Sequence, residues 1–119
     1  MKPAKILIID DEPGMRWVLE KLLKEEGYSV VKAADGMEGI NKLTSDISMI
    51  LLDYKMPGIS GLETLDRIMT KRPEMAVIFM TGHSSMPVAL EALKKGARAY
   101  VTKPFHLSEL KVTVKKALE

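Results

Sequence analysis

The sequence predicts an α/β fold, in which helices cover both faces of one doubly wound, five-stranded parallel sheet. Five short apolar runs, each of strand length, alternate along the chain with five segments whose apolar residues recur at helical spacing. Such alternation is typical of parallel sheets, whose crossover connections are helical and right-handed. Five strands are too few for an eight-stranded barrel, so an open sheet is the best fit.

The first strand is predicted at Ile6–Ile9, a continuous apolar run that is followed by acidic residues at 10–12. A helix comes next, because apolar residues fall at i, i+3, i+4, i+7 and i+8. These residues are Met15, Val18, Leu19, Leu22 and Leu23. We expect Gly27 to end this helix just after its C-cap. Trp17 lies off the apolar stripe and is expected to be partly exposed.

The second strand and helix are shorter. Val30 and Val31 predict a more polar strand near an edge of the sheet. Asp35 is expected to be the N-cap of a helix that runs to about Thr44, since Glu38, three residues further on, completes a capping box. The inward positions of this helix are Ile40 and Leu43.

The third strand is the apolar run 49–52, which stops at Asp53. Four apolar residues are enough for a buried strand and too few for a buried helix. A Pro-Gly turn at 57–58 follows, and then a helix over 61–71 that ends before Pro73. Its apolar positions are Leu62, Leu65, Ile68 and Met69. Asp53 is therefore expected where a buried strand reaches the surface, rigidly held and open to a ligand.

The fourth strand is predicted over Ala76–Met80, directly before Thr81. One of the serines at 84–85 is expected to cap the next helix, with Pro87 in its first turn. Gly96 is expected to end this helix. Its inner face is predicted to carry Val88, Ala89, Ala92 and Leu93.

The fifth strand is predicted over Ala99–Val101 and stops at residues 102–104. The last helix begins near His106. One side of this helix is predicted to carry Leu107, Leu110, Val114, Ala117 and Leu118. Neither an internal repeat nor a linker interrupts the pattern, so we expect residues 1–119 to form a single domain.

Composition excludes several classes of function. The chain has 119 residues and no cysteine, so disulfides and thiolate metal sites are excluded. The net charge of +2 is too small to argue for nucleic-acid binding. The apolar runs are too short to span a membrane. Because the start at Met1 leads directly into a strand, no room is left for a signal peptide, and we expect a soluble, cytoplasmic domain.

The residues that follow the apolar runs carry the chemistry. They are Asp10, Asp11, Asp53, Thr81 and Lys103. Ligands of open α/β sheets bind beyond the carboxyl ends of the strands, so these side chains should converge at one edge. Two carboxylates about 5 Å apart repel by roughly 3 kcal/mol at an effective dielectric near 20, which favours a raised pKa or a bound cation. With oxygen ligands alone, Mg²⁺ fits best. Alternatively, Asp11 or Glu12 is simply the N-cap of the first helix.

A basic and a hydroxyl residue complete the predicted site. The ammonium of Lys103 can neutralise charge on a phosphoryl group, and the Thr81 hydroxyl can donate a hydrogen bond to it, beside the small Gly82. Lys103 can instead be a structural ion-pair partner of Asp53. A carboxylate such as Asp53 can be the nucleophile and form an aspartyl phosphate. Phosphoryl transfer mainly requires alignment and charge stabilisation, for which these groups suffice.

Taken together, these residues resemble the receiver domain of two-component response regulators over essentially the whole chain. The motifs that carry the resemblance are Ile8-Ile9-Asp10-Asp11, Leu51-Leu52-Asp53, Met56-Pro57-Gly58 with Gly61, Met80-Thr81-Gly82-His83, and Tyr100 with Lys103-Pro104-Phe105. Each is weak alone, but the full set in order is specific. The resemblance implies the flavodoxin-like (βα)5 receiver fold with strand order 2-1-3-4-5.

The resemblance also implies roles for individual residues. Asp53 would accept a phosphoryl group from a histidine kinase or a phosphotransfer protein. Mg²⁺ would be held by Asp10, Asp11, Asp53 and the backbone carbonyl of Lys55. Thr81 and Lys103 would hold the phosphoryl oxygens. In such domains the threonine then shifts and the aromatic residue, here Tyr100, turns inward, which changes the surface of the fourth helix, fifth strand and fifth helix. Tyr100 can also be an ordinary strand aromatic.

The implied partners are a sensor histidine kinase or a phosphotransfer protein and, as further options, a tethered output domain beyond residue 119 and a homodimer that depends on phosphorylation. The alternative to an output domain is a single-domain member of a phosphorelay. The segment itself is expected to bind neither DNA nor a membrane, and to act as a regulatory phospho-acceptor rather than an enzyme, apart from its own phosphotransfer and autodephosphorylation. Candidate kinase contacts are Met15, Trp17 and the pair Phe105-His106. Departures from common receiver patterns are Lys55 and His83, at positions that tune phosphate hydrolysis, and His106 at a helix cap.

Three other functions compete with this interpretation. A flavodoxin-like flavin protein would need an amide-rich loop after the first strand, whereas the acidic residues 10–12 repel phosphate. A phosphatase of the haloacid dehalogenase type usually has a second aspartate two residues after its nucleophile, where this chain has Lys55. A receiver-like interaction module without phosphorylation is disfavoured by the complete set of acids with Thr81 and Lys103.

Overall fold

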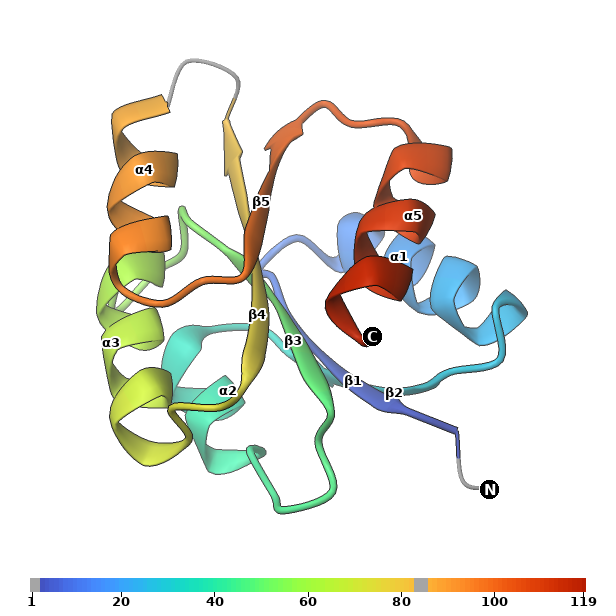
Figure 1. Ribbon diagram of the computed structural model, residues 1–119, viewed down its shortest axis with the longest axis horizontal. Helices are drawn as coiled ribbons and strands as arrows, with labels where there is room; N and C mark the ends of the chain where they lie inside the picture. The colour runs from blue at the N-terminus through green and yellow to red at the C-terminus, as the bar shows by residue number, and fades with distance from the viewer. Residues whose placement is uncertain (1–2, 83–85) are drawn as a thin grey trace.

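The computed structural model describes residues 3–82 and 86–119, and within these ranges it contains five strands and five helices (Figure 1). The strands are β1 (Lys5–Ile9), β2 (Ser29–Ala33), β3 (Met49–Asp53), β4 (Ala76–Gly82) and β5 (Ala99–Lys103). The helices are α1 (Pro13–Glu25), α2 (Gly36–Asn41), α3 (Gly61–Lys71), α4 (Met86–Lys94) and α5 (Leu107–Ala117). Helix and strand alternate throughout, as predicted.

The five strands form one parallel sheet in the order β2-β1-β3-β4-β5. Figure 1 shows α1 and α5 on one face of this sheet and α2, α3 and α4 on the other. Each face has its own apolar cluster, one containing Leu19 and Leu110, the other Leu65 and Phe79. The doubly wound fold class and the strand order are therefore confirmed.

Burial explains why the strands differ in sequence. The three inner strands are covered on both faces and are apolar almost throughout, since polar side chains would lose water on either side. The outer strands β2 and β5 are only half-buried along much of their length. The predicted edge position of the strand at Val30 and Val31 is correct.

The helix boundaries agree well with the sequence, with one correction. Gly27 and Gly96 follow α1 and α4 with φ angles of +93° and +112°, which supports their roles at helix ends. Asp35 caps α2 by accepting from the Glu38 N–H, while the Glu38 carboxylate accepts from Ala34 rather than from Asp35. The predicted end of α2 at Thr44 is wrong: the helix ends at Asn41 because the chain tightens into three-residue turns.

Five further predictions need correction or fall outside the described residues. Strands β4 and β5 continue through Gly82 and Lys103, because their backbone pairing persists beyond the last apolar residue. Leu93 is exposed because the buried face of α4 is narrow, with Ala89 and Ala92 buried and Leu93 beside them. Leu107 is exposed because it begins α5, one turn before the first buried residue. The predicted cap at residues 84–85 lies outside the described ranges.

Candidate functional site

The predicted functional residues gather at the carboxyl edge of the sheet. Asp10 directly follows β1, Asp53 and Lys103 are the last residues of β3 and β5, and Thr81 lies at the end of β4. The parallel arrangement brings these four strand ends side by side. The sequence-based expectation that they converge is correct.

Asp10 is fully buried, and two contacts of its carboxylate hold it in place. One carboxylate oxygen accepts from the Glu12 N–H at 3.0 Å, and the other lies 3.1 Å from the Lys103 ammonium. Glu12 is the N-cap of α1, but its side chain forms no capping hydrogen bond. The alternative interpretation is therefore right about position, since Glu12 is the N-cap, but the Glu12 side chain does not cap the helix.

Three carboxylates converge beside one ammonium. Ligand oxygens of Asp10, Asp11 and Asp53 lie within 4.8 Å of one another. The Lys103 Nζ lies 3.1 Å from both Asp10 and Asp53, and 4.0 Å from the exposed Glu12. An all-oxygen cluster of this kind suits a hard divalent cation. The residues present thus fit a metal ion.

Burial raises the pKa of Asp53 from 3.8 to about 6, the charge of Asp10 adds to this effect, and Lys103 opposes it. Asp53 is only 6% exposed, which explains why desolvation dominates. Burial lowers the pKa of Lys103, but the carboxylates of Asp53 and Asp10 outweigh this and raise it above its usual value. Asp53 is thus a carboxylate whose charge the fold disfavours, and a cation would relieve the penalty.

The loop after β3 is fixed by close backbone packing. The Tyr54 N–H donates to the Met80 carbonyl, and the Gly61 N–H donates to the Tyr54 carbonyl, both at 2.9 Å. A Cβ at Gly61 would lie 2.5 Å from the Asp53 carbonyl oxygen, so α3 can start this close to β3 only with glycine. Gly58 has a φ of +80°, which suits the turn between them. Asp53 is therefore held rigidly, as expected.

Thr81 is fully buried, and its hydroxyl has no hydrogen-bond partner within residues 3–82 and 86–119. Buried hydroxyl groups usually have a partner, and an unsatisfied one lowers stability. The neighbouring Gly82 is exposed and lines the cavity at this edge. Thr81 thus lies on the strand that pairs with β3 beside Asp53, but it is not among the residues that line this cavity.

A cavity of about 300 Å³ opens over the cluster. It is lined by Asp11, Glu12, Asp53, Tyr54, Lys55, Gly82 and Lys103. Glu12 and Tyr54 were not among the predicted site residues; Glu12 continues the acidic run after Asp11, and that signal could have found it. Lys55 lies at the cavity as predicted, although its carbonyl as a ligand remains a prediction. His83 lies outside the described residues.

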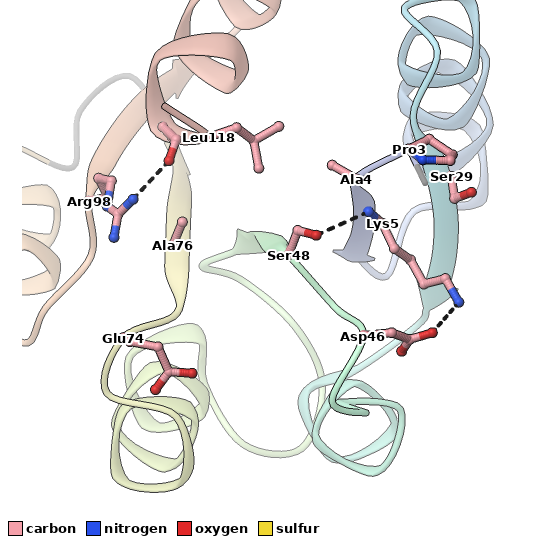
Figure 2. A pocket seen from close by; sticks show the side chains of 11 residues that line it. Pro3, Ala4, Lys5, Ser29, Asp46, Ser48, Glu74, Ala76, Arg98 and Leu118 are labelled. Atoms are coloured by element: carbon pink, nitrogen blue, oxygen red, sulfur yellow. Dashed lines mark hydrogen bonds and ion pairs between the residues drawn. The ribbon is translucent and has the colours of Figure 1, made fainter. Parts of the chain in front are cut away.

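A larger hollow of about 700 Å³ lies at the opposite, amino end of the strands (Figure 2). Its charged groups are already engaged: Lys5 pairs with Asp46, and Arg98 donates to the Ala117 carbonyl. Among the described residues, the three-carboxylate cluster occurs only at the other end. The chemistry of the molecule is therefore concentrated in the smaller cavity.

Tyr100 lies on β5 and is half-buried against the apolar cluster that includes α3 and α4. Its hydroxyl lies 3.5 Å from the Met86 sulfur. Trp17, one of the predicted kinase contacts, is 61% exposed, with Lys21 over its ring. Met15 and Phe105 pack partly buried against the core. Their roles as a switch and as kinase contacts stay predictions.

The fold and the carboxylate cluster define a receiver-type, phospho-accepting signalling domain, and comparison with known proteins agrees. The family model "Response regulator receiver domain" matches residues 6–115. The chain belongs to this family.

The curated relatives include transcriptional regulatory proteins and a phosphotransferase. The chain is 36% identical to the transcriptional regulatory protein GlrR of Escherichia coli over 99% of its own length and 27% of that protein. It is 35% identical to sporulation initiation phosphotransferase F of Bacillus subtilis, covering 99% of this chain and 96% of that protein. The chain thus spans about a quarter of the first relative, with 27% covered, and nearly all of the second.

Solved structures show the same fold. A response regulator receiver domain protein from Clostridium thermocellum matches with a TM-score of 0.91 and 36% identity, covering 97% of this chain and 94% of that one. The receiver domain of NtrX from Brucella abortus matches with a TM-score of 0.91 and 29% identity, covering 95% and 97%. Within the described residues, none of the helices has the length and apolar character needed to cross a membrane.

Proposed function

We propose that Asp53 accepts a phosphoryl group from a phosphohistidine, carried by a sensor histidine kinase or a phosphotransfer protein, with Mg²⁺ as cofactor. The observation that carries this proposal is the convergence of three carboxylates and Lys103 around a cavity that Asp53 itself lines. Family membership supports the reaction class, and the geometry supports the choice of residue.

The reaction is an in-line displacement. A carboxylate oxygen of Asp53 forms a bond to phosphorus while the bond from phosphorus to the donor's imidazole nitrogen breaks, and the imidazole keeps that electron pair. The attacking carboxylate must be ionised, which a pKa of about 6 permits at neutral pH. The reaction serves only the protein's own phosphorylation and later hydrolysis of the aspartyl phosphate, so this is a regulatory domain.

Asp10, Asp11, Asp53 and the carbonyl of Lys55 would hold the magnesium ion. When bound, Mg²⁺ neutralises charge on the phosphoryl oxygens and on the crowded acids. Lys103 lies 3.1 Å from an Asp53 oxygen, within reach of a group attached to that carboxylate. The Thr81 hydroxyl, which has no partner in the described part of the chain, would donate to a phosphoryl oxygen.

The output would pass through the surface formed by α4, β5 and α5. Thr81 and Tyr100 are the proposed switch residues, and the Tyr100 hydroxyl contacts Met86 at the start of α4. Met86 and Leu90 expose apolar side chains on that helix, which suits a surface for a partner, an output domain or a second copy in a phosphorylation-dependent homodimer. We place this exchange in the cytoplasm and assign no nucleic-acid contact to this domain.

The domain organisation belongs to the same proposal. Residues 1–119 would form one receiver domain. In a longer protein an output domain would follow, as the lengths of relatives such as the DNA-binding transcriptional regulator NtrC suggest, since the chain covers only 24% of the Klebsiella pneumoniae protein.

The test is intact-mass measurement after incubation with acetyl phosphate and Mg²⁺. We expect wild type to gain one phosphoryl group, and neither Asp53→Asn nor a chelator-treated sample to do so. Asp46→Asn, at the other end of the sheet, is the matched control and should be phosphorylated normally. Absence of an adduct in wild type, together with failure of beryllofluoride to bind, would refute the proposal and favour an interaction module without phosphorylation.

A further inference from the structure

We propose that Arg16 is a positioning residue of the metal site, which holds the carbonyl of Asp10 and thereby fixes the peptide that places Asp11 in the carboxylate cluster. The inference rests on the proposed function. It adds a residue from α1 that acts on the metal through the backbone of a ligand.

The contact is a hydrogen bond from a side chain to the backbone. The Arg16 Nη1 donates to the Asp10 carbonyl oxygen at 2.8 Å. Asp10 lies just beyond β1, and its N–H still donates to the Ala33 carbonyl at 3.1 Å. The carbonyl of Asp10 and the N–H of Asp11 belong to one planar peptide group. A donor that fixes this carbonyl therefore also fixes the direction in which the chain enters Asp11.

Asp11 depends on this backbone more than its neighbours do. The Asp10 carboxylate is held by the Glu12 N–H and Lys103, and the Asp53 carboxylate by Lys103. Within residues 3–82 and 86–119, the Asp11 carboxylate has neither a hydrogen-bond partner nor an ion-pair partner. Its place in the 4.8 Å cluster thus follows from the course of its main chain.

Arg16 is itself well placed for this task. Its backbone N–H donates to the Glu12 carbonyl at 3.0 Å, so it belongs to the first turn of α1. It is half-buried. Hydrogen bonds from Ala34 and Lys42 hold the pKa of Glu38 below its usual value, and the charge of Arg16 adds a smaller contribution. The guanidinium thus contacts the loop after β1, and its charge also acts on Glu38 of α2.

The charge of Arg16 and its hydrogen bond have opposite effects on the affinity of the site for a metal cation. A guanidinium repels a divalent cation, so charge alone predicts that removing Arg16 tightens metal binding. Loss of positioning predicts weaker binding, because residues that orient metal ligands typically change metal affinity by roughly 10–100-fold. The sign of the change separates the two effects.

The experiment measures Mn²⁺ binding to the full chain by electron paramagnetic resonance of the free ion, without a phosphoryl donor. We expect Arg16→Met to weaken binding by about tenfold, and Arg16→Lys, which keeps a donor of similar reach, to recover most of the affinity. Arg98→Met is the matched control, because it loses the same kind of bond, to the Ala117 carbonyl at 2.8 Å, at the other end of the sheet (Figure 2). It should bind Mn²⁺ like wild type.

Phosphorylation by acetyl phosphate gives a second readout. Arg16→Met should need more Mg²⁺ for half-maximal rate but approach the wild-type rate at saturation, since the reacting groups are intact. If circular dichroism shows that this variant does not fold, Arg16→Gln replaces it. The amide of glutamine is polar like the guanidinium, but its side chain is two bonds shorter and does not reach the Asp10 carbonyl.

The inference and the proposed function fail in different ways. Wild type that binds Mn²⁺, with Arg16→Met binding equally well or more tightly, would overturn the positioning role alone. Equal weakening by Arg16→Lys and Arg16→Met would also overturn it, since a donor would then not matter. Wild type that binds no Mn²⁺ would overturn the metal site and the inference with it.

Discussion

The raised pKa of Asp53 predicts that Asp53→Asn stabilises the metal-free protein at neutral pH. The unfolded chain releases this proton near its ordinary pKa of 3.8, whereas the folded protein holds it to about 6. The folded state therefore binds more protons between these values, and its stability falls as the pH rises from about 4 to about 6. Above pH 6 the charged carboxylate remains a penalty that asparagine does not carry.

The size of the effect follows from the shift. A difference of about 2 pKa units corresponds to about 3 kcal/mol as an upper limit. The cavity over the carboxylate admits solvent, which screens part of this penalty, so we expect Asp53→Asn to raise the free energy of unfolding by roughly 1–2 kcal/mol. For a domain of this size that corresponds to roughly 4–8 °C in Tm.

The assay is urea unfolding at pH 7.5 in EDTA, repeated at pH 4.5, where the difference between wild type and Asp53→Asn should shrink. Asp46→Asn is the control of opposite sign. A hydrogen bond from Lys5 and a second from Thr44 lower the pKa of Asp46 to about 2, so losing that charge should not stabilise the protein. An Asp53→Asn variant that is no more stable than wild type at pH 7.5 would refute the reasoning.

Three further predictions concern the same edge of the sheet. Mg²⁺ at 100 times its Kd should raise the free energy of unfolding of wild type by about 2.7 kcal/mol in urea unfolding. At the same Mg²⁺ concentration, Asp11→Asn should lose most of this gain, and a gain equal to that of wild type would show that Asp11 is not a metal ligand. Thr81→Ala should change stability little, because it removes an unsatisfied buried hydroxyl, which favours the variant, together with a buried methyl group, which favours wild type. It should slow phosphorylation by acetyl phosphate at least about tenfold, and an unchanged rate would remove Thr81 from the site. Gly61→Ala should destabilise by about 1–3 kcal/mol, since its Cβ would lie 2.5 Å from the Asp53 carbonyl; a neutral variant would show that the loop after β3 can move.

Most of the fold could be predicted because each inner strand is covered on both faces. A strand buried in this way must be continuously apolar, so its position and its end are visible in the sequence. The run before Asp53 is the clearest case, since the strand ends at the acid in both sequence and structure. Parallel strands then place these ends at one edge, which made the gathering of Asp10, Asp53 and Lys103 predictable.

Where the prediction was wrong, backbone pairing and neighbouring layers decided the outcome. Gly82 and Lys103 continue β4 and β5 because main-chain hydrogen bonding does not depend on apolar side chains. Leu93 and Leu107 were assigned to inner faces from spacing alone, but the width of the covered stripe depends on how closely each helix packs on the sheet. Helical periodicity in the sequence gives no information about how close each helix lies to the sheet.

The origin of the Asp53 pKa shift was also beyond sequence reasoning. Repulsion among the acids predicted the direction, yet burial is the larger cause, followed by the charge of Asp10. Burial depends on how α3 packs against the end of β3 through Gly61, and on how much of the loop covers the carboxylate. The bond from Arg16 to Asp10 likewise depends on a side-chain rotamer of α1.

The charge balance of the cluster is compatible with both the divalent cation and the phosphoryl group that we propose for this site. When all are ionised, the carboxylates of Asp10, Asp11 and Asp53 and the Lys103 ammonium leave a surplus of two negative charges. A divalent cation cancels this surplus, which a monovalent ion would only halve. The proposed phosphorylation of Asp53 would replace one carboxylate charge by a group that carries about two near neutral pH. The added charge would fall beside Lys103, so the ammonium that pairs with the acids before the reaction would be able to pair with the phosphoryl group after it.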